Sequence, residues 1–200
     1  MIDWPVTLIP NEMTLGVASN AKTFQSPFTG AVQTVSYPGA KVKVTLKYSN
    51  LTKAQADELE TLLMALDGQA GRVRLWDFRA RLVSSPQPVN GNPVVAEATA
   101  MRTVCTTRGW TPGAKVLTRG QWVQIGTELK RVLSDVTADA SGAATLRIAP
   151  MLRSTWPSGT ALTVDRPCGI FQLDKDEWSG DATPGTFYSY SIPFVEVFYP

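Results

Sequence analysis

Two β-like runs joined by a short polar turn occupy residues 121–153, and they constrain the fold more than any other stretch. The turn, residues 139–142 (Asp-Ala-Ser-Gly), combines residue types that favour chain reversal. Residues 129–136 before it are strand-like, and residues 144–148 after it alternate small or apolar with polar side chains. Such runs form a hairpin, and the apolar side of a hairpin must pack on another part of the molecule.

The sequence around this hairpin indicates a small all-β body. Residues 94–166 contain about six short β-like runs, separated by turn signals such as Pro-Gly, Arg-Gly and Ser-Gly. Short strands at this density are typical of a small barrel of the OB or SH3-like kind. The runs that we expect to form strands are residues 94–106, 115–117, 121–125, 128–136, 143–148 and 161–164.

The first part of the chain predicts strands and one helix. Residues 41–48 (KVKVTLKY) alternate between apolar and mostly lysine side chains, as in a strand with one buried face. Residues 53–66 form the helix, with Thr52 as N-cap, Gln55 as its capping-box partner and Gly68 as C-terminal cap. Four leucines lie at the spacing of one buried stripe, which predicts that the helix lies across a sheet. They are Leu59, Leu62, Leu63 and Leu66.

Changes in composition divide the chain. Residues 84–93 contain three prolines and indicate a linker, and the all-β body ends at about residue 167. Residues 186–199 are dense in aromatic side chains, which a short terminal segment cannot bury alone. We therefore expect this segment to return to the N-terminal strands and to cover the helix.

The predicted fold is mainly β with one amphipathic helix (α+β). Residues 1–83 plus 168–200 form a discontinuous belt-type domain, a β-sandwich or barrel, and residues 84–167 form an inserted OB-like β-barrel. Residues 39–83 carry a positive net charge and residues 168–200 a negative one. These charges pair within the fold or across a head-to-tail subunit contact, and the sequence leaves both arrangements open.

Composition also bears on partners and location. The formal net charge of +2 lacks the strong basic surplus of a nucleic-acid binder, so no nucleic-acid specificity is expected. No apolar run approaches the ~20 residues of a membrane helix, and the first residues lack the features of a signal peptide. We expect synthesis in a cytoplasm without membrane insertion. Cys105 and Cys168 are too few for a disulfide framework, and free buried thiols are expected.

The sequence offers no recognisable catalytic chemistry. It contains no histidine, which removes the commonest general base and metal ligand and excludes Ser–His–Asp and Cys–His nucleophile systems. Phosphate-loop, dinucleotide-binding and zinc-protease motifs are also absent. The acidic residues Asp174, Asp176 and Glu177 lack the spacing of a calcium loop, and we interpret them as a solvated turn. We therefore expect no enzyme activity and no catalytic, cofactor-binding or metal-binding residues. An enzyme that acts on polysaccharide or peptidoglycan through a pair of carboxylates stays an alternative, because such a pair is defined by its separation in space.

Tryptophans are the remaining candidates for a ligand site. Trp110, Trp122 and Trp156 lie in the predicted barrel, and Trp178 follows it. On a small β-barrel, such rings stack on sugars or bases, or else they fill the core and rim of the barrel. Packing is the commoner role, and ligand contact is the alternative.

A loop at residues 23–30 carries two further candidates for a partner contact, Phe24 and Phe28. Exposed aromatic side chains on a loop anchor protein partners. Large apolar side chains more often fold back beneath their own loop, which is the arrangement that we expect here.

Three segments together resemble the distal tail or tail-tip ring proteins of long-tailed bacteriophages. Residues 51–68 have the form L-x-x-A-x-A-x-x-L-x-x-L-L-x-x-L-x-G, and residues 72–77 read R-V-R-L-W-D. Residues 129–153 have the form L-K-R-V-x-x-D-x-x-A-D-x-x-G-x-A-T-L-x-I-x-P-x-L-R, of which residues 142–153 are the most specific part.

The resemblance implies a structural role without catalysis. It implies a belt domain that closes into a homo-oligomeric ring, usually a hexamer, with an OB-like inserted domain facing outward. The ring would lie at the virion tail tip or baseplate, after synthesis in the cytoplasm of the bacterial host. There it would link the tail tube protein to the tail hub, the receptor-binding apparatus and other tail-tip proteins. The alternative function is a carbohydrate- or cell-surface-binding module that uses the inserted barrel.

Overall fold

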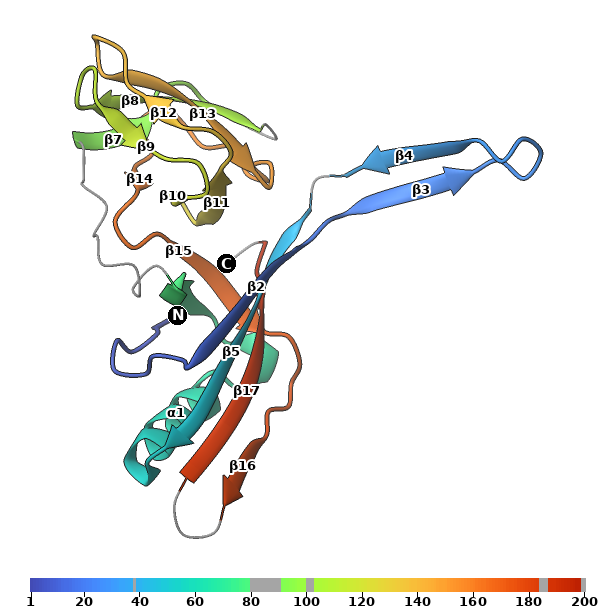
Figure 1. The fold of residues 1–200 in the computed structure, drawn as a ribbon, viewed down its shortest axis with the longest axis vertical. Helices are drawn as coiled ribbons and strands as arrows, with labels where there is room; N and C mark the ends of the chain where they lie inside the picture. The colour runs from blue at the N-terminus through green and yellow to red at the C-terminus, as the bar shows by residue number, and fades with distance from the viewer. Residues whose placement is uncertain (38, 80–90, 100–102, 184–186, 199–200) are drawn as a thin grey trace.

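The computed structural model describes residues 1–37, 39–79, 91–99, 103–183 and 187–198. Within these ranges the fold is mainly β with a single α-helix, and one sheet curves into a nearly closed barrel, which confirms the predicted class. Figure 1 shows two bodies, each built on its own sheet, and a two-stranded arm that projects from one of them. We call them the sheet body and the barrel, and each has a separate buried core.

The sheet body draws its strands from both ends of the chain. Its sheet has the order β1-β6-β15-β17-β5-β2, and β16 pairs with β17 beside this path. Because β17 pairs with β5, the aromatic C-terminal segment does return to the N-terminal strands. The strands are β1 (Ile2–Asp3), β2 (Glu12–Ala18), β5 (Lys41–Leu51), β6 (Val73–Trp76), β15 (Cys168–Leu173), β16 (Gly180–Thr183) and β17 (Phe187–Glu196).

The helix α1 (Lys53–Ala65) covers one face of this sheet and takes the place that a second sheet has in a sandwich. The predicted capping box is present, since the Gln55 N–H donates to the Thr52 hydroxyl and the Thr52 N–H donates to Gln55 Oε1. The predicted leucine stripe is buried. Its members Leu59, Leu62, Leu63 and Leu66 pack in a core with Trp4, Tyr48, Phe171 and Phe194.

The end of the helix differs from the prediction. Leu66, and not Gly68, is the C-cap. Asp67 and Gly68 both have positive φ, 49° and 61°, and Gly68 begins the short 3₁₀ helix η1 (Gly68–Ala70). The chain therefore needs two consecutive left-handed residues to leave the helix, of which sequence reasoning identified only the glycine.

The strand β5 has the two faces that its alternation predicts. Val42, Val44 and Leu46 are fully buried, whereas Lys43 and Lys47 point to solvent. Lys43 forms an ion pair with Asp174, so part of the predicted charge pairing between the two chain segments occurs within the fold.

The barrel has the strand order β14-β10-β11-β13-β8-β7. Its two end strands approach each other, because the Val95 N–H donates to the Thr160 carbonyl and the Gly159 N–H donates to the Val95 carbonyl. A separate pair, β9 with β12, lies against the same core. The strands are β7 (Gly91–Val95), β8 (Val104–Trp110), β9 (Lys115–Leu117), β10 (Trp122–Ile125), β11 (Glu128–Val132), β12 (Val136–Thr137), β13 (Ala143–Ala149) and β14 (Leu162–Thr163).

Two strand predictions in the barrel were too long. The expected single strand at residues 94–106 is the end of β7 and the start of β8, which pair as antiparallel neighbours. The chain bends after β7, where the Thr99 hydroxyl donates to the Glu97 carbonyl. The predicted linker at residues 84–93 overlaps β7, and its residues 84–90 lie outside the described residues.

The second strand prediction concerned residues 128–136, the first arm of the central hairpin. This run divides into β11, which pairs with β13, and β12, which pairs with β9. The turn itself is as predicted: the Asp139 carboxylate accepts from the N–H groups of Ser141 and Ala143 and from the Ser141 hydroxyl. Gly142 has a φ of 77°, and a Cβ there would lie 2.5 Å from the Trp110 carbonyl oxygen, so the turn requires glycine.

Candidate functional site

The arm consists of β3 (Ala21–Gln25) and β4 (Val32–Ser36), which pair only with each other. It continues the line of β2 and β5 and projects well beyond the sheet body (Figure 1). Every residue of β3 is exposed, and so is every residue of β4 except the half-buried Val35. Lys22 is the single charged residue between residues 17 and 37, so this exposed surface is made of apolar and uncharged polar side chains.

The tip of the arm is a hydrogen-bonded turn. The Ser26 hydroxyl accepts from the N–H groups of Phe28 and Thr29, and the Gly30 N–H donates to the Ser26 carbonyl. The Ala31 N–H donates to the Thr29 hydroxyl. These local bonds fix the backbone that carries Phe28, which lowers the entropy lost when a partner immobilises the tip.

Phe28 is 96% exposed and Phe24 is 54% exposed. The expectation that both rings fold beneath their own loop is therefore wrong. The physical reason is that a two-stranded arm has no second layer, so neither of its faces offers a core to cover a ring. Phe24 and Val32 also line an open hollow on the arm with Gln25, Ser26, Ala31 and Gln33.

The three barrel tryptophans have packing roles. Trp110 is buried and donates from Nε1 to the Thr107 hydroxyl, and Trp122 is buried and donates to Asp77 Oδ2 at 2.9 Å. Trp156 is partly buried and donates to Glu128, and its ring lies so close to Gly126 that any Cβ there would clash with it. Trp110 and Trp122 are therefore held in the protein interior, whereas Trp156 packs on Gly126 and stays partly exposed.

The residues 174–177 form a turn with structural contacts. Asp176 Oδ1 accepts from the Gln69 N–H, and Asp174 pairs with Lys43. Among the residues that the structure describes, no group of three His, Cys, Asp or Glu side chains is arranged to hold a metal ion. Cys105 and Cys168 are both free thiols; Cys105 is buried as expected, whereas Cys168 is only partly buried.

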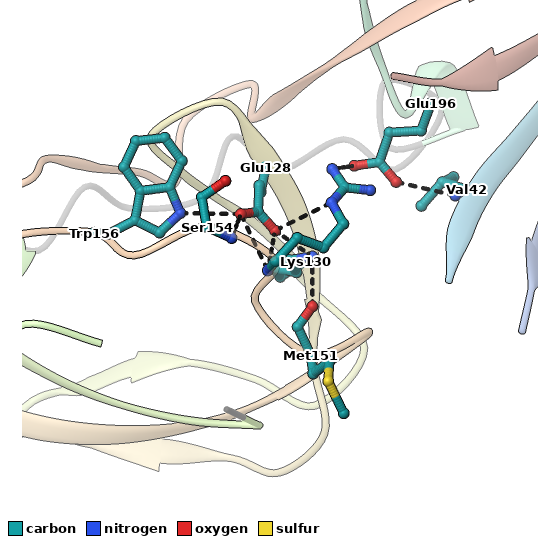
Figure 2. Close-up of polar contacts among 8 residues, drawn as sticks. Val42, Glu128, Lys130, Met151, Ser154, Trp156 and Glu196 are labelled. Atoms are coloured by element: carbon teal, nitrogen blue, oxygen red, sulfur yellow. Dashed lines mark hydrogen bonds and ion pairs between the residues drawn. The ribbon is translucent and has the colours of Figure 1, made fainter. Parts of the chain in front are cut away.

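A second feature, which sequence reasoning did not identify, is a cluster of buried charges between the barrel and the sheet body (Figure 2). Glu128 and Lys130 come from β11, Arg153 follows β13, and Glu196 ends β17 of the sheet body. Glu128, Lys130 and Glu196 are each at most 1% exposed. We call these four residues the joint, and its two acidic and two basic side chains balance in charge.

Glu128 is the centre of the hydrogen bonding in the joint. Its carboxylate accepts from the backbone N–H groups of Arg153 and Ser154, from Trp156 Nε1, and from Lys130 Nζ at 2.8 Å. Lys130 Nζ also donates to the Met151 carbonyl at 3.0 Å. The cluster thereby ties the segment after β13 to β11.

Burial and pairing act in opposite directions on the charges of the joint. Burial raises the pKa of Glu128, but the Lys130 charge and the hydrogen bonds from Lys130, Arg153 and Ser154 outweigh it, so the pKa lies below its usual range. Burial lowers the pKa of Lys130, and the adjacent Glu128 carboxylate opposes that shift. The carboxylate of Glu128 and the ammonium group of Lys130 thus stabilise each other's charged form against the effect of burial.

Arg153 connects the barrel to the sheet body. Its Nη2 donates to Glu196 Oε1 at 2.7 Å, and its Nε lies 3.5 Å from Glu128 Oε2. Two further polar links cross the same boundary: Trp122 to Asp77, already described, and the Cys168 N–H, which donates to Gln124 Oε1 at 3.0 Å.

No known protein family matches this chain, and no match was found among curated proteins. No helix in the described parts of the chain is long and apolar enough to cross a membrane.

Proposed function

We propose that the chain is a structural subunit of a phage tail tip or baseplate. In this proposal its copies form a ring, usually of six subunits, that links the tail tube to the hub or the receptor-binding apparatus. The sequence resemblance to tail-tip ring proteins supports this role. The observation that carries it is the projecting arm, whose rigid tip presents an almost fully exposed phenylalanine.

The surface of the arm supports a contact with protein. Of the twelve large apolar side chains that are exposed in the described residues, five lie between residues 17 and 37. They are Val17, Phe24, Phe28, Val32 and Tyr37. Interface cores are depleted in charge and enriched in aromatic residues, and this segment has both properties. Large exposed apolar patches are rare on monomeric proteins and usually mark a site that binds another molecule.

We favour a second copy of the chain as the protein that binds the arm. Four other exposed apolar side chains belong to the N-terminal segment and to α1, which lie on the side of the sheet body away from the arm (Figure 1). Thr7 holds the N-terminal loop to the helix by a hydrogen bond to Glu58. Because the two apolar sets lie on different surfaces, a contact between them is head-to-tail, and such contacts form a ring when the rotation between copies closes. The four side chains are Met1, Val6, Ile9 and Met64.

The test compares assembly of the wild type with that of an arm variant. Phe24→Ser/Phe28→Ser removes both exposed rings of the arm, and the control Phe187→Ser removes a ring from β17 that is 46% exposed. Size-exclusion chromatography with light scattering, together with negative-stain images of virions, measures the result. The proposal expects rings for the wild type and for Phe187→Ser, and monomers of the 21.7 kDa chain for the arm variant.

Two results would count against the proposal. One is a wild type that stays monomeric at high concentration and is missing from rings in virions. The other is an arm variant that assembles as well as the wild type. For the carbohydrate-binding alternative, Trp110 and Trp122 are buried, and Trp156 is the one of the three barrel tryptophans that stays partly exposed.

A further inference from the structure

We propose that Arg153 is a positioning residue that fixes the orientation of the barrel relative to the root of the arm. The inference concerns the single chain and does not depend on ring assembly. The contacts of the Arg153 guanidinium with Glu196 and Phe198, which both contact β5, are the basis for it.

The guanidinium lies between the two bodies and is not fully satisfied there. It binds Glu196 of the sheet body through Nη2 and approaches Glu128 of the barrel through Nε. Its remaining nitrogen, Nη1, has no hydrogen-bond acceptor among the described residues, although the Arg153 side chain is only 7% exposed. A buried donor without a partner costs stability, so the hydrogen bonds of the guanidinium do not by themselves explain why arginine occupies this place. The planar fork of arginine instead supplies a defined geometry between two carboxylates.

The contacts continue from Glu196 to the root of the arm. Glu196 Oε2 accepts from the Val42 N–H at 3.0 Å, and Val42 pairs with Val17 where β2 leads into the arm. The Phe198 ring lies between two cations, Arg153 at 4.7 Å and Lys41 at 4.8 Å from its centroid. Arg153 is thus in contact with both Glu196 and Phe198. These two residues in turn contact Val42 and Lys41 at the start of β5.

The place of the Arg153–Glu196 contact along the boundary is the reason why we assign it the orientation of the barrel. The other two polar links end at Asp77 and Cys168, at one end of β6 and β15, where Cys168 pairs with Trp76. Glu196 pairs with Phe171, which is three residues further along β15 and therefore about 10 Å away. The Asp77 and Cys168 links lie at this end of the two strands, as do the contact of Arg166 with the Trp76 ring and the approach of Leu129 to Gly169. A rotation of the barrel about this end would strain these contacts least, and Arg153, which acts farther along β15, opposes that rotation.

The experiment measures the distance between the bodies in the full chain. Spin labels are placed at exposed Thr145 on β13 and exposed Thr14 on β2 by noncanonical amino acids, which leaves both native cysteines in place. Labelled protein is diluted into unlabelled protein, so that only distances within one chain are recorded. The proposal expects one narrow distance peak for the wild type and loss of that peak in Arg153→Met.

The control is Lys115→Met, which removes a barrel cation from an exposed ion pair with Asp135. It should keep the narrow peak. Hydrogen exchange of β8 and β13 confirms that each variant is folded. If Arg153→Met loses that protection, Arg153→Lys takes its place, because lysine keeps the charge but cannot bridge both carboxylates with one fixed fork. A folded Arg153 variant with the distance peak of the wild type would overturn the proposal.

Discussion

Replacing Glu128 by glutamine should destabilise the barrel strongly, although the change is nearly isosteric. The carboxylate is 1% exposed and accepts from four donor groups, including the ammonium group of Lys130, which is itself 0% exposed. Glutamine keeps one acceptor but turns an amide donor toward the cluster and leaves Lys130 without its counter-charge. Removing one partner of a buried ion pair costs about 3–5 kcal/mol.

The assay is urea unfolding followed by tryptophan fluorescence and by far-ultraviolet circular dichroism. With a slope of about 2 kcal/mol per molar urea, the loss lowers the midpoint by about 1.5–2.5 M. The matched control is Asp165→Asn on the barrel surface, which removes one exposed carboxylate and should change stability by less than about 0.5 kcal/mol.

A double variant separates the charge effect from the shape effect. Glu128→Gln/Lys130→Met removes both charges and should recover part of the loss, because no unpaired charge then remains buried. A cost below about 1 kcal/mol for Glu128→Gln alone would refute the view that the buried pair holds the barrel segments together.

Two further predictions concern pH and the core of the sheet body. Because the pKa of Glu128 in the folded chain lies below its unfolded value near 4.5, its stabilising contribution is complete above that value and is lost as the pH falls through the folded pKa. Unfolding curves at several pH values should therefore show that the difference in free energy of unfolding between wild type and Glu128→Gln is largest at pH 7 and decreases below about pH 4.5. A difference that does not depend on pH contradicts this. Leu63→Ala removes a side chain that is 1% exposed beneath the sheet and should cost about 2–5 kcal/mol. Because the cores are separate, hydrogen exchange should accelerate in β5 while β13 stays protected, and equal acceleration in both would argue for one cooperative unit.

Local patterns in the sequence were enough to predict most elements of the fold. The lysine–valine alternation of β5, the leucine stripe of α1 and the Asp139 turn depend on residues that are close in sequence, and all three form as expected. The predictions failed where the chain leaves a regular pattern. The chain leaves α1 after its C-cap Leu66 through a left-handed conformation at Asp67, which the residue type alone does not specify.

The candidate sites were less predictable, because their properties depend on distant parts of the chain. Phe24 and Phe28 are exposed because their strands find no third strand or covering layer, which local sequence does not report. Glu128 and Lys130 lie two residues apart on β11, a spacing that ordinarily indicates a solvated face. In the fold they are buried together with Leu129, against the segment that carries Arg153 and Ser154.

Photo-cross-linking from the tip of the arm tests the central claim most directly. Position 28 is replaced by p-benzoylphenylalanine, which keeps an aromatic side chain there, and the full-length protein is irradiated at high concentration and in virions. We expect covalent ladders that stop at the ring size, with cross-linked peptides from the N-terminal segment or α1 of another copy. Cross-links confined to the same chain, or directed only to other proteins, would contradict it.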